Sequence, residues 1–256
     1  MNGHSLEKFK QDLLALGVKP GDTVLMHSSF KSLGGIEGGA AGLFRVFQEV
    51  LGEEGTLILP ALSYAFVDAK QPVFDLDQTK SCIGFLPEYF RTQVPHVIRS
   101  LHATHSCCLW GKRAQEMAAG HEKDLTPVGE NSPFAKLPKV DGKILMLGCH
   151  PDHNTSMHGV EETAEPPYLL EKHFTSYVLK NGEQEIHQQA IRHNFVVDGV
   201  HWNQRYSRII GLLDENEVSH GKVLDAECYL MSAKAVWEKG HEKLMEDPWY
   251  FVEKPV

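Results

Sequence analysis

The sequence predicts an α/β fold, a single layered domain in which helices flank a mixed central β-sheet. Two observations predict it. Short apolar runs bounded by glycines or other turn residues recur along the chain, which is typical of buried strands. Amphipathic segments separate the first of these runs, so the first sixty residues alternate as helix, strand, loop, helix and strand, the pattern of a layered α/β domain. The 256 residues contain no linker or repeat, so we expect one domain over 1–256.

Two helices and two strands are expected in the N-terminal quarter. Ser5 is a typical N-cap for the first helix, and Gly17 is its expected end. Gly38 and Gly39 open the second helix, which ends at Gly52. Buried strands are expected at 23–27 and 55–60, with a polar loop at 28–35.

Residues 61–82 show no clear periodicity and are expected to form a substrate-side loop inserted in the domain. A loop of this length in a compact domain is usually functional or mobile. Beyond it the expected elements are short helices at 85–90 and 113–119 and after Ser132-Pro133, strands at 107–111 and 143–148, a β-hairpin at 177–187 turning at Asn181-Gly182, and a last strand and helix between 224 and 244.

The composition excludes several classes of protein. A net charge of −9 argues against general nucleic-acid binding, which needs clustered Lys and Arg. No apolar stretch approaches the roughly 18 residues of a membrane span, and the N-terminus does not resemble a signal peptide. The five irregularly spaced cysteines form neither a disulfide framework nor a paired zinc motif. We therefore expect a cytoplasmic protein.

The stretch 149–162 is the most concentrated group of chemically active side chains. It follows the predicted buried strand at 143–148, and ligands in open α/β sheets bind outside the carboxyl ends of strands. His158 is a candidate general base, because imidazole titrates near neutral pH. Glu161, three residues on, would share a helix face with His158 and orient its ring. An ordinary histidine at a helix start is the alternative.

Other readings of the same region stay open. Cys149, His150, His153 and His158 could hold a catalytic metal, although their spacing is not a familiar zinc pattern. A metal-dependent hydrolase built on 149–158 is thus the rival enzyme class. Cys149 is a weaker candidate as a nucleophile, since a cysteine after a strand is commonly inert core.

Several motifs, taken in order, resemble the aminoglycoside 3-N-acetyltransferase family, the antibiotic N-acetyltransferases that are separate from the GNAT fold. They are His27-Ser28-Ser29 with Ser32-Leu33-Gly34, Gly38-Gly39, Gly55-Thr56-Leu57 with Pro60, Phe74-Asp75, Arg99-Ser100-x-His102 with Ser106 and Gly111, Ser132-Pro133, and Thr155-x-x-His158-x-x-Glu161. The resemblance covers most of 5–165, and its specificity lies in the order and spacing of the motifs.

This resemblance implies direct transfer of an acetyl group from acetyl-CoA to an amine, with no metal, and His158 as the base. The residues expected to hold the cofactor are Ser28, Ser29, Lys31, Ser32, Leu33, Gly34, His102 and Ser106. For His102 and Ser106, structural hydrogen bonding in a turn is an equal alternative. The chain departs from well-studied relatives at His193, near which they carry a carboxylate that completes the catalytic pair. Glu161, Glu162 or Glu185 could take that role.

The acceptor is expected to be a small-molecule amine, and the family implies the 3-amino group of an aminoglycoside's deoxystreptamine ring. The candidate acceptor-binding residues are Tyr64, Asp75, Glu162 and His193. The loop after Pro60 is apolar and aromatic, whereas a polycation needs several acids, so another amino sugar or amine is an alternative acceptor. A binding protein that has lost catalysis is the non-enzymatic alternative. We expect no nucleic-acid or membrane partner, and a homodimer is as compatible with the sequence as a monomer.

Overall fold

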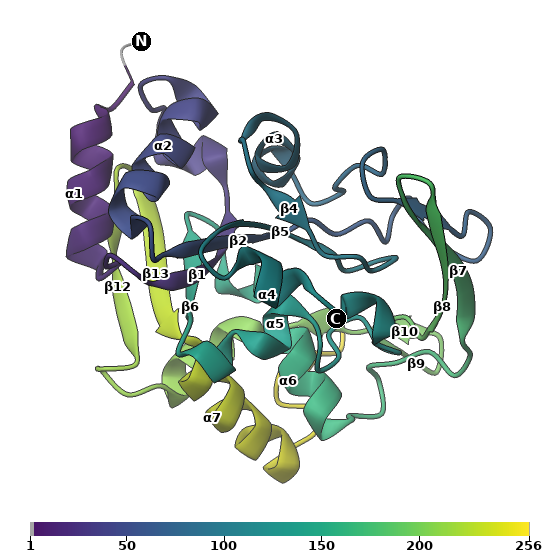
Figure 1. Ribbon diagram of the computed structural model, residues 1–256. Coiled ribbons are helices and arrows are strands. Elements are labelled where there is room, and N and C mark those ends of the chain that lie inside the picture. The colour runs from purple at the N-terminus through teal and green to yellow at the C-terminus, as the bar shows by residue number, and fades with distance from the viewer. Residues whose placement is uncertain (1–2, 256) are drawn as a thin grey trace.

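A seven-stranded mixed sheet forms the centre of the computed structural model, which describes residues 3–255 (Figure 1). Its strands, from edge to edge, are β12 (Val218–Val223), β13 (Ala226–Ser232), β6 (Lys143–Leu147), β1 (Thr23–Ser28), β2 (Thr56–Pro60), β5 (Cys107–Gly111) and β4 (Ile98–Arg99). The middle three, β6, β1 and β2, are parallel, and every other neighbouring pair is antiparallel. The predicted mixed sheet flanked by helices is confirmed.

Helices cover both faces of this sheet, because successive side chains of the central strands point to opposite sides. Val24 and Met26 of β1 pack on one face and Leu25 on the other. Figure 1 shows α1 (Leu6–Leu16), α2 (Gly39–Leu51) and α3 (Phe85–Gln93) on the first face, and α4 (Ala114–Ala118), α5 (Pro133–Lys136), α6 (Met157–Ala164) and α7 (Ala233–Glu246) on the second. The parallel strands are therefore buried on both faces.

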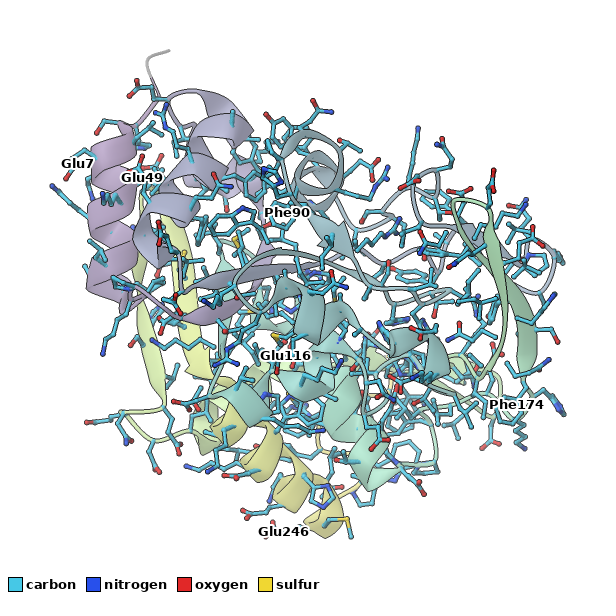
Figure 2. The ribbon with its side chains drawn as sticks, in the orientation of Figure 1. Glu7, Glu49, Phe90, Glu116, Phe174 and Glu246 are labelled. Atoms are coloured by element: carbon cyan, nitrogen blue, oxygen red, sulfur yellow. The ribbon has the colours of Figure 1, made fainter. Side chains whose placement is uncertain are left out.

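The helix ends follow the predicted local chemistry. The Ser5 side chain accepts a hydrogen bond from the backbone N–H of Lys8, and Gly17 ends α1 in the left-handed conformation. α2 ends before Gly52, as expected. In the first helical layer Phe90 of α3, labelled in Figure 2, stacks on Phe44 of α2 with ring centres 4.8 Å apart.

A smaller three-stranded sheet stands at the right of Figure 1, made of β3 (Val73–Asp75), β7 (Thr175–Asn181) and β8 (Gln184–Ala190). β7 and β8 are the predicted hairpin, but Asn181 pairs with Gln184, so the turn lies at Gly182 and Glu183, one residue later than predicted. β3 lies parallel to β7 and ties the 61–82 segment to residues a hundred positions further on.

The 61–82 segment is not a free loop. Two arginines hold it in place through hydrogen bonds to its backbone. Arg99 donates to the backbone carbonyls of Ala61, Leu76 and Thr79. Arg192 donates to the carbonyls of Tyr64 and Val67.

The C-terminal region differs from the prediction. A hairpin of β12 and β13 replaces the single expected strand, because Leu224 adopts a left-handed conformation and reverses the chain there. Two short ribbons complete the fold, β9 (Val196–Val197) with β10 (Val200–His201), and β11 (Asn203–Gln204) with β14 (Val252–Glu253). Within residues 3–255, the helices are all too short or too polar to traverse a bilayer.

We expect Gly148→Ala to lower the free energy of unfolding by about 3 kcal/mol, the sum of backbone strain and overpacking. Gly148 follows β6 at φ +70°, and an added Cβ would lie 2.1 Å from Ser32 Oγ. Gly182→Ala is the control: Gly182 has φ +59° and nothing within 4 Å, so only strain of about 1 kcal/mol remains. Urea unfolding measures both, and equal losses would contradict the role given to the contact with Ser32.

Candidate active site

A cavity of about 1290 Å³ opens where the three parallel strands end. Its wall includes Ser28 and Ser29 after β1, Leu62 and Tyr64 after β2, and Cys149 after β6. The carboxyl ends of neighbouring parallel strands meet at one edge of a sheet, so loops that are distant in sequence come together there. This position matches the one predicted from the strand at 143–148.

Three of the six residues expected in the cofactor loop line this cavity, namely Ser28, Ser29 and Lys31. The other three do not. Ser32 donates through Oγ to the carbonyls of Ser29 and Gly148, which fastens the loop to the end of β6. Leu33 is fully buried in the core, and Gly34, at φ +77°, ends a short 3-10 helix at Phe30–Leu33. Their role is to shape the loop.

His102 and Ser106 also lie beneath the wall, without exposed surface, and this corrects their expected place at the cofactor. Nδ1 of His102 accepts hydrogen bonds from the backbone N–H groups of Thr104 and His105. Ser106 Oγ donates to the carbonyl of Ala61. Both side chains hold the turn between β4 and β5, and this turn presents His105 to the cavity.

Two of the four expected acceptor-binding residues, Tyr64 and His193, line the cavity. Asp75 does not, because its carboxylate accepts the backbone N–H groups of Asp77 and Gln78 at the end of β3. Glu162 stands behind His193 and contacts Nε2 of that ring at 2.7 Å. Glu162 Oε1 also accepts the backbone N–H of Val128 at 2.9 Å.

His158 lies at the start of α6 and is connected to a buried carboxylate by a tyrosine. Its Nδ1 is 2.9 Å from the hydroxyl of Tyr206, and that hydroxyl is 2.7 Å from Oε2 of Glu161. Nδ1 and Oε2 are 3.6 Å apart. Glu161 has no exposed surface, and its other oxygen accepts the hydroxyl of Tyr168 at 2.9 Å. Glu161 is thus close to His158 as predicted, and the Tyr206 hydroxyl contacts both side chains.

These contacts determine which nitrogen of His158 carries the proton. Tyr206 has one hydroxyl proton, and the adjacent Glu161 carboxylate accepts it. The Tyr206 oxygen is then the acceptor for N–H at Nδ1 of His158, which leaves the lone pair at Nε2. Burial, followed by the charge of Glu161, raises the pKa of the Tyr206 hydroxyl, which keeps it protonated as a donor.

The pKa values of Glu162 and His193 are both shifted in the direction that favours the neutral side chain. Burial raises the pKa of Glu162 to about 7, and burial lowers the pKa of His193. Since Glu162 Oε1 already accepts from Val128, it serves as an acceptor for N–H at Nε2 of His193 too. Nδ1 of His193 is left buried with no hydrogen-bond partner among the described residues.

The metal cluster considered for 149–158 is not assembled. Cys149, His150 and His153 line the cavity, but none of them joins His158 in a group with metal-binding geometry within residues 3–255. His150 pairs instead with Asp152 at 3.2 Å. Burial raises the pKa of the Cys149 thiol to about 12, which makes it a poor nucleophile.

Tyr206 and His105 are the principal site residues that sequence reasoning missed. Tyr206 lies 48 positions beyond His158, at the start of the 3-10 helix Tyr206–Leu212, and no sequence motif marks it. It is positioned by packing, and by the backbone N–H of Ser207, which donates to Asp152 at 2.8 Å. His105 lies within the motifs between Arg99 and Gly111. It differs from His102 only in that the turn directs its side chain into the cavity.

Comparison with known proteins agrees with this fold. The sequence profile of a family described as aminoglycoside 3-N-acetyltransferase matches residues 25–245. Aminoglycoside N(3)-acetyltransferase IX of Micromonospora chalcea is 30% identical to this chain. The match covers 90% of this chain and 89% of that protein. The prophage-derived aminoglycoside N(3')-acetyltransferase-like protein YokD of Bacillus subtilis is 32% identical over 60% of this chain, and this chain spans 64% of that protein.

Among solved structures, a histidine mutant of the aminoglycoside acetyltransferase AAC(3)-IVa in complex with gentamicin superposes with a TM-score of 0.80. It is 25% identical, and the match covers 98% of this chain and 92% of that one.

Acid should destabilise the fold through its buried histidines. Burial lowers the pKa of His27 and of His102 to about 3. Between their unfolded pKa of about 6.5 and pH 3, the unfolded chain binds protons that the native state does not, so the free energy of unfolding falls as pH falls. At pH 5 the loss is about 2 kcal/mol per histidine.

His102→Asn keeps an acceptor near the position of Nδ1 but does not titrate. Urea unfolding at pH 7 and pH 5 should show a smaller acid-induced loss in this variant, by about 2 kcal/mol. An identical loss in the variant and the original chain would contradict the buried, neutral state of His102.

Proposed function

The chain belongs to the aminoglycoside 3-N-acetyltransferase family, and from this premise we propose that it transfers the acetyl group of acetyl-CoA directly to an amino group of an aminoglycoside, at position 3 of the deoxystreptamine ring. His158 is the general base. The observation that carries the proposal is the free Nε2 lone pair of His158, held in a strand-end cavity by the Tyr206–Glu161 contact.

On the donor side, the loop after β1 offers groups that suit the CoA arm. Ser28 and Ser29 present small hydroxyls, and Lys31 offers a cation for a phosphate. Phe30 and Phe85 also line the cavity, with their ring centres 5.7 Å apart. Both rings are available for apolar contact with the pantetheine chain.

At the reacting end, Nε2 of His158 takes a proton from the acceptor's ammonium group, and the free amine then attacks the thioester carbonyl. The N–C bond forms, the C–S bond breaks, and the departing CoA thiolate takes the second proton that the attacking nitrogen loses as it becomes an amide. The imidazolium formed on His158 is stabilised by the Glu161 carboxylate through Tyr206. Base catalysis of this kind contributes about 10²–10⁴-fold, and holding amine and thioester together contributes much of the rest.

His193 does not supply the carboxylate that well-studied relatives carry in its region. In this chain Glu161 is the carboxylate connected to the base, from three residues along the same helix. This supports an active enzyme over a binding protein that has lost catalysis.

One observation favours a second class of acceptor. Asp152 is the one carboxylate among the described residues that line the cavity, and its oxygens already contact Ser207 N–H and His150. Many other acids lie on the exposed sides of helices, for example Glu7, Glu49, Glu116 and Glu246 (Figure 2). A polycationic aminoglycoside gains little attraction from such a wall, so an amino sugar or amine with fewer charges is the alternative acceptor.

Release of free thiol from acetyl-CoA in the presence of an amine tests the proposal. We expect turnover with a deoxystreptamine aminoglycoside, and His158→Ala should lower kcat by about 10²–10⁴-fold while acetyl-CoA still binds. Turnover that survives intact in His158→Ala would reject the base assignment. Turnover with amino sugars bearing one amine, and none with aminoglycosides, would select the second class of acceptor.

Two tyrosine variants test the connection to the carboxylate. Tyr206→Phe removes the hydrogen bonds to both His158 and Glu161, and we expect kcat to fall about ten- to a hundredfold, the equivalent of a hydrogen bond to a charged group. Tyr168→Phe removes a hydroxyl from the same carboxylate without touching His158, so its effect on kcat should be smaller. Equal kcat losses in the two variants would mean that Tyr206 acts only by supporting the fold around Glu161.

A further inference from the structure

Three imidazoles converge at the inner end of the cavity. His105 comes from the turn between β4 and β5, His158 from α6, and His193 from the segment between β8 and β9. One ring nitrogen of each lies within 4.8 Å of those of the other two. The ring centres of His158 and His193 are 4.6 Å apart, and those of His105 and His193 are 5.0 Å apart.

One nitrogen of each ring has an oxygen partner. Nδ1 of His158 contacts Tyr206, which connects it to the Glu161 carboxylate, and Nε2 of His193 contacts the Glu162 carboxylate. Nδ1 of His105 is 2.9 Å from the hydroxyl of Thr104. Histidines that bind metals almost always bond through their second nitrogen to a carboxylate, a carbonyl or water, because this fixes the tautomer and the direction of the lone pair.

The other nitrogen of each ring has no such partner. Among residues 3–255 no hydrogen bond reaches Nε2 of His105, Nε2 of His158 or Nδ1 of His193. Nδ1 of His193 is also shielded from solvent. Buried polar atoms are normally paired, so an unpaired buried nitrogen in a ring that converges with two other imidazoles indicates a missing ligand.

We propose that His105, His158 and His193 form a binding site for a divalent transition metal, with Zn²⁺ as the preferred ion, and that the bound ion inhibits acetyl transfer. The ion would occupy the lone pair that His158 needs to deprotonate the amine. Acetyl transfer itself needs no metal. The inhibition rests on the proposed function, whereas metal binding does not.

The ligand set selects the class of metal. Three neutral imidazoles and no direct carboxylate suit Zn²⁺, Co²⁺, Ni²⁺ or Cu²⁺, whereas Mg²⁺ and Ca²⁺ require oxygen ligands. Zn–N bonds of about 2.0–2.1 Å in a tetrahedron place the nitrogens roughly 3.4 Å apart. The three nitrogens now lie within 4.8 Å of one another, so metal binding would bring them closer by up to a little more than 1 Å. The fourth position would face the cavity, because all three histidines line it.

Titration of tag-free, metal-free protein with Co²⁺ tests binding without relying on activity, since tetrahedral Co²⁺ has characteristic visible absorption. We expect one ion per chain. His105→Ala, His158→Ala and His193→Ala should each weaken binding by at least on the order of a hundredfold. His150→Ala is the matched control, because His150 lines the same cavity outside the cluster, and it should keep the affinity.

Glu162→Gln provides a milder variant that keeps all three ligands and should weaken Co²⁺ binding about ten- to a hundredfold. Zn²⁺ should inhibit thiol release, and a chelator should restore it. Inhibition of His105→Ala is measured relative to that variant's own rate without metal. The Zn²⁺ concentration that halves this rate should be higher than for the original chain by on the order of a hundredfold.

The outcomes separate this proposal from the proposed function. Absence of tetrahedral Co²⁺ absorption, or absorption that persists in all three alanine variants, overturns the metal site even if acetyl transfer is active. Co²⁺ binding that depends on the three histidines, in a protein that acetylates no amine, supports the site and rejects the enzyme. Active transfer that is insensitive to Zn²⁺ despite such binding overturns the inhibitory role.

Discussion

The site depends on a carboxylate that has no contact with water. Burying Glu161 is unfavourable unless its oxygens are hydrogen-bonded, and the hydroxyls of Tyr168 and Tyr206 provide those bonds. The Tyr206 hydroxyl also orients His158, so the same contact stabilises the buried charge and directs the catalytic lone pair. α6 packs closely against α7, and Gly159 permits this approach, since a Cβ there would be 2.3 Å from the ring of Trp237.

The oriented lone pair of His158 has two chemical uses that exclude each other. A base needs a free nitrogen whose partner nitrogen is fixed, and a metal ligand needs the same. The neighbouring His105 and His193 convert a site with one base into one with three convergent nitrogens. His193 contributes one of these nitrogens as a neutral imidazole, because burial lowers its pKa.

Local chemistry explains which elements were predictable. The N-cap at Ser5, the glycine stops, the strands at 23–27 and 55–60 and the β7–β8 hairpin all depend on neighbouring residues, and the structure confirms them. The hairpin of β12 and β13 was missed because its reversal occurs at Leu224, a residue that rarely adopts positive φ. The 61–82 segment looked unstructured because its anchors, Arg99 and Arg192, lie far along the chain.

The sequence by itself determined the family, the layered fold and the candidate base, because motif order, apolar periodicity and the run from Thr155 to Glu161 are all readable along the chain. Only the tertiary structure decided which side chains reach the cavity. His102 and His105 are three residues apart, yet one supports a turn and the other lines the wall. Likewise Tyr206 joins His158 only because two distant segments pack together. Side-chain direction and long-range contact come from packing, which no local pattern encodes.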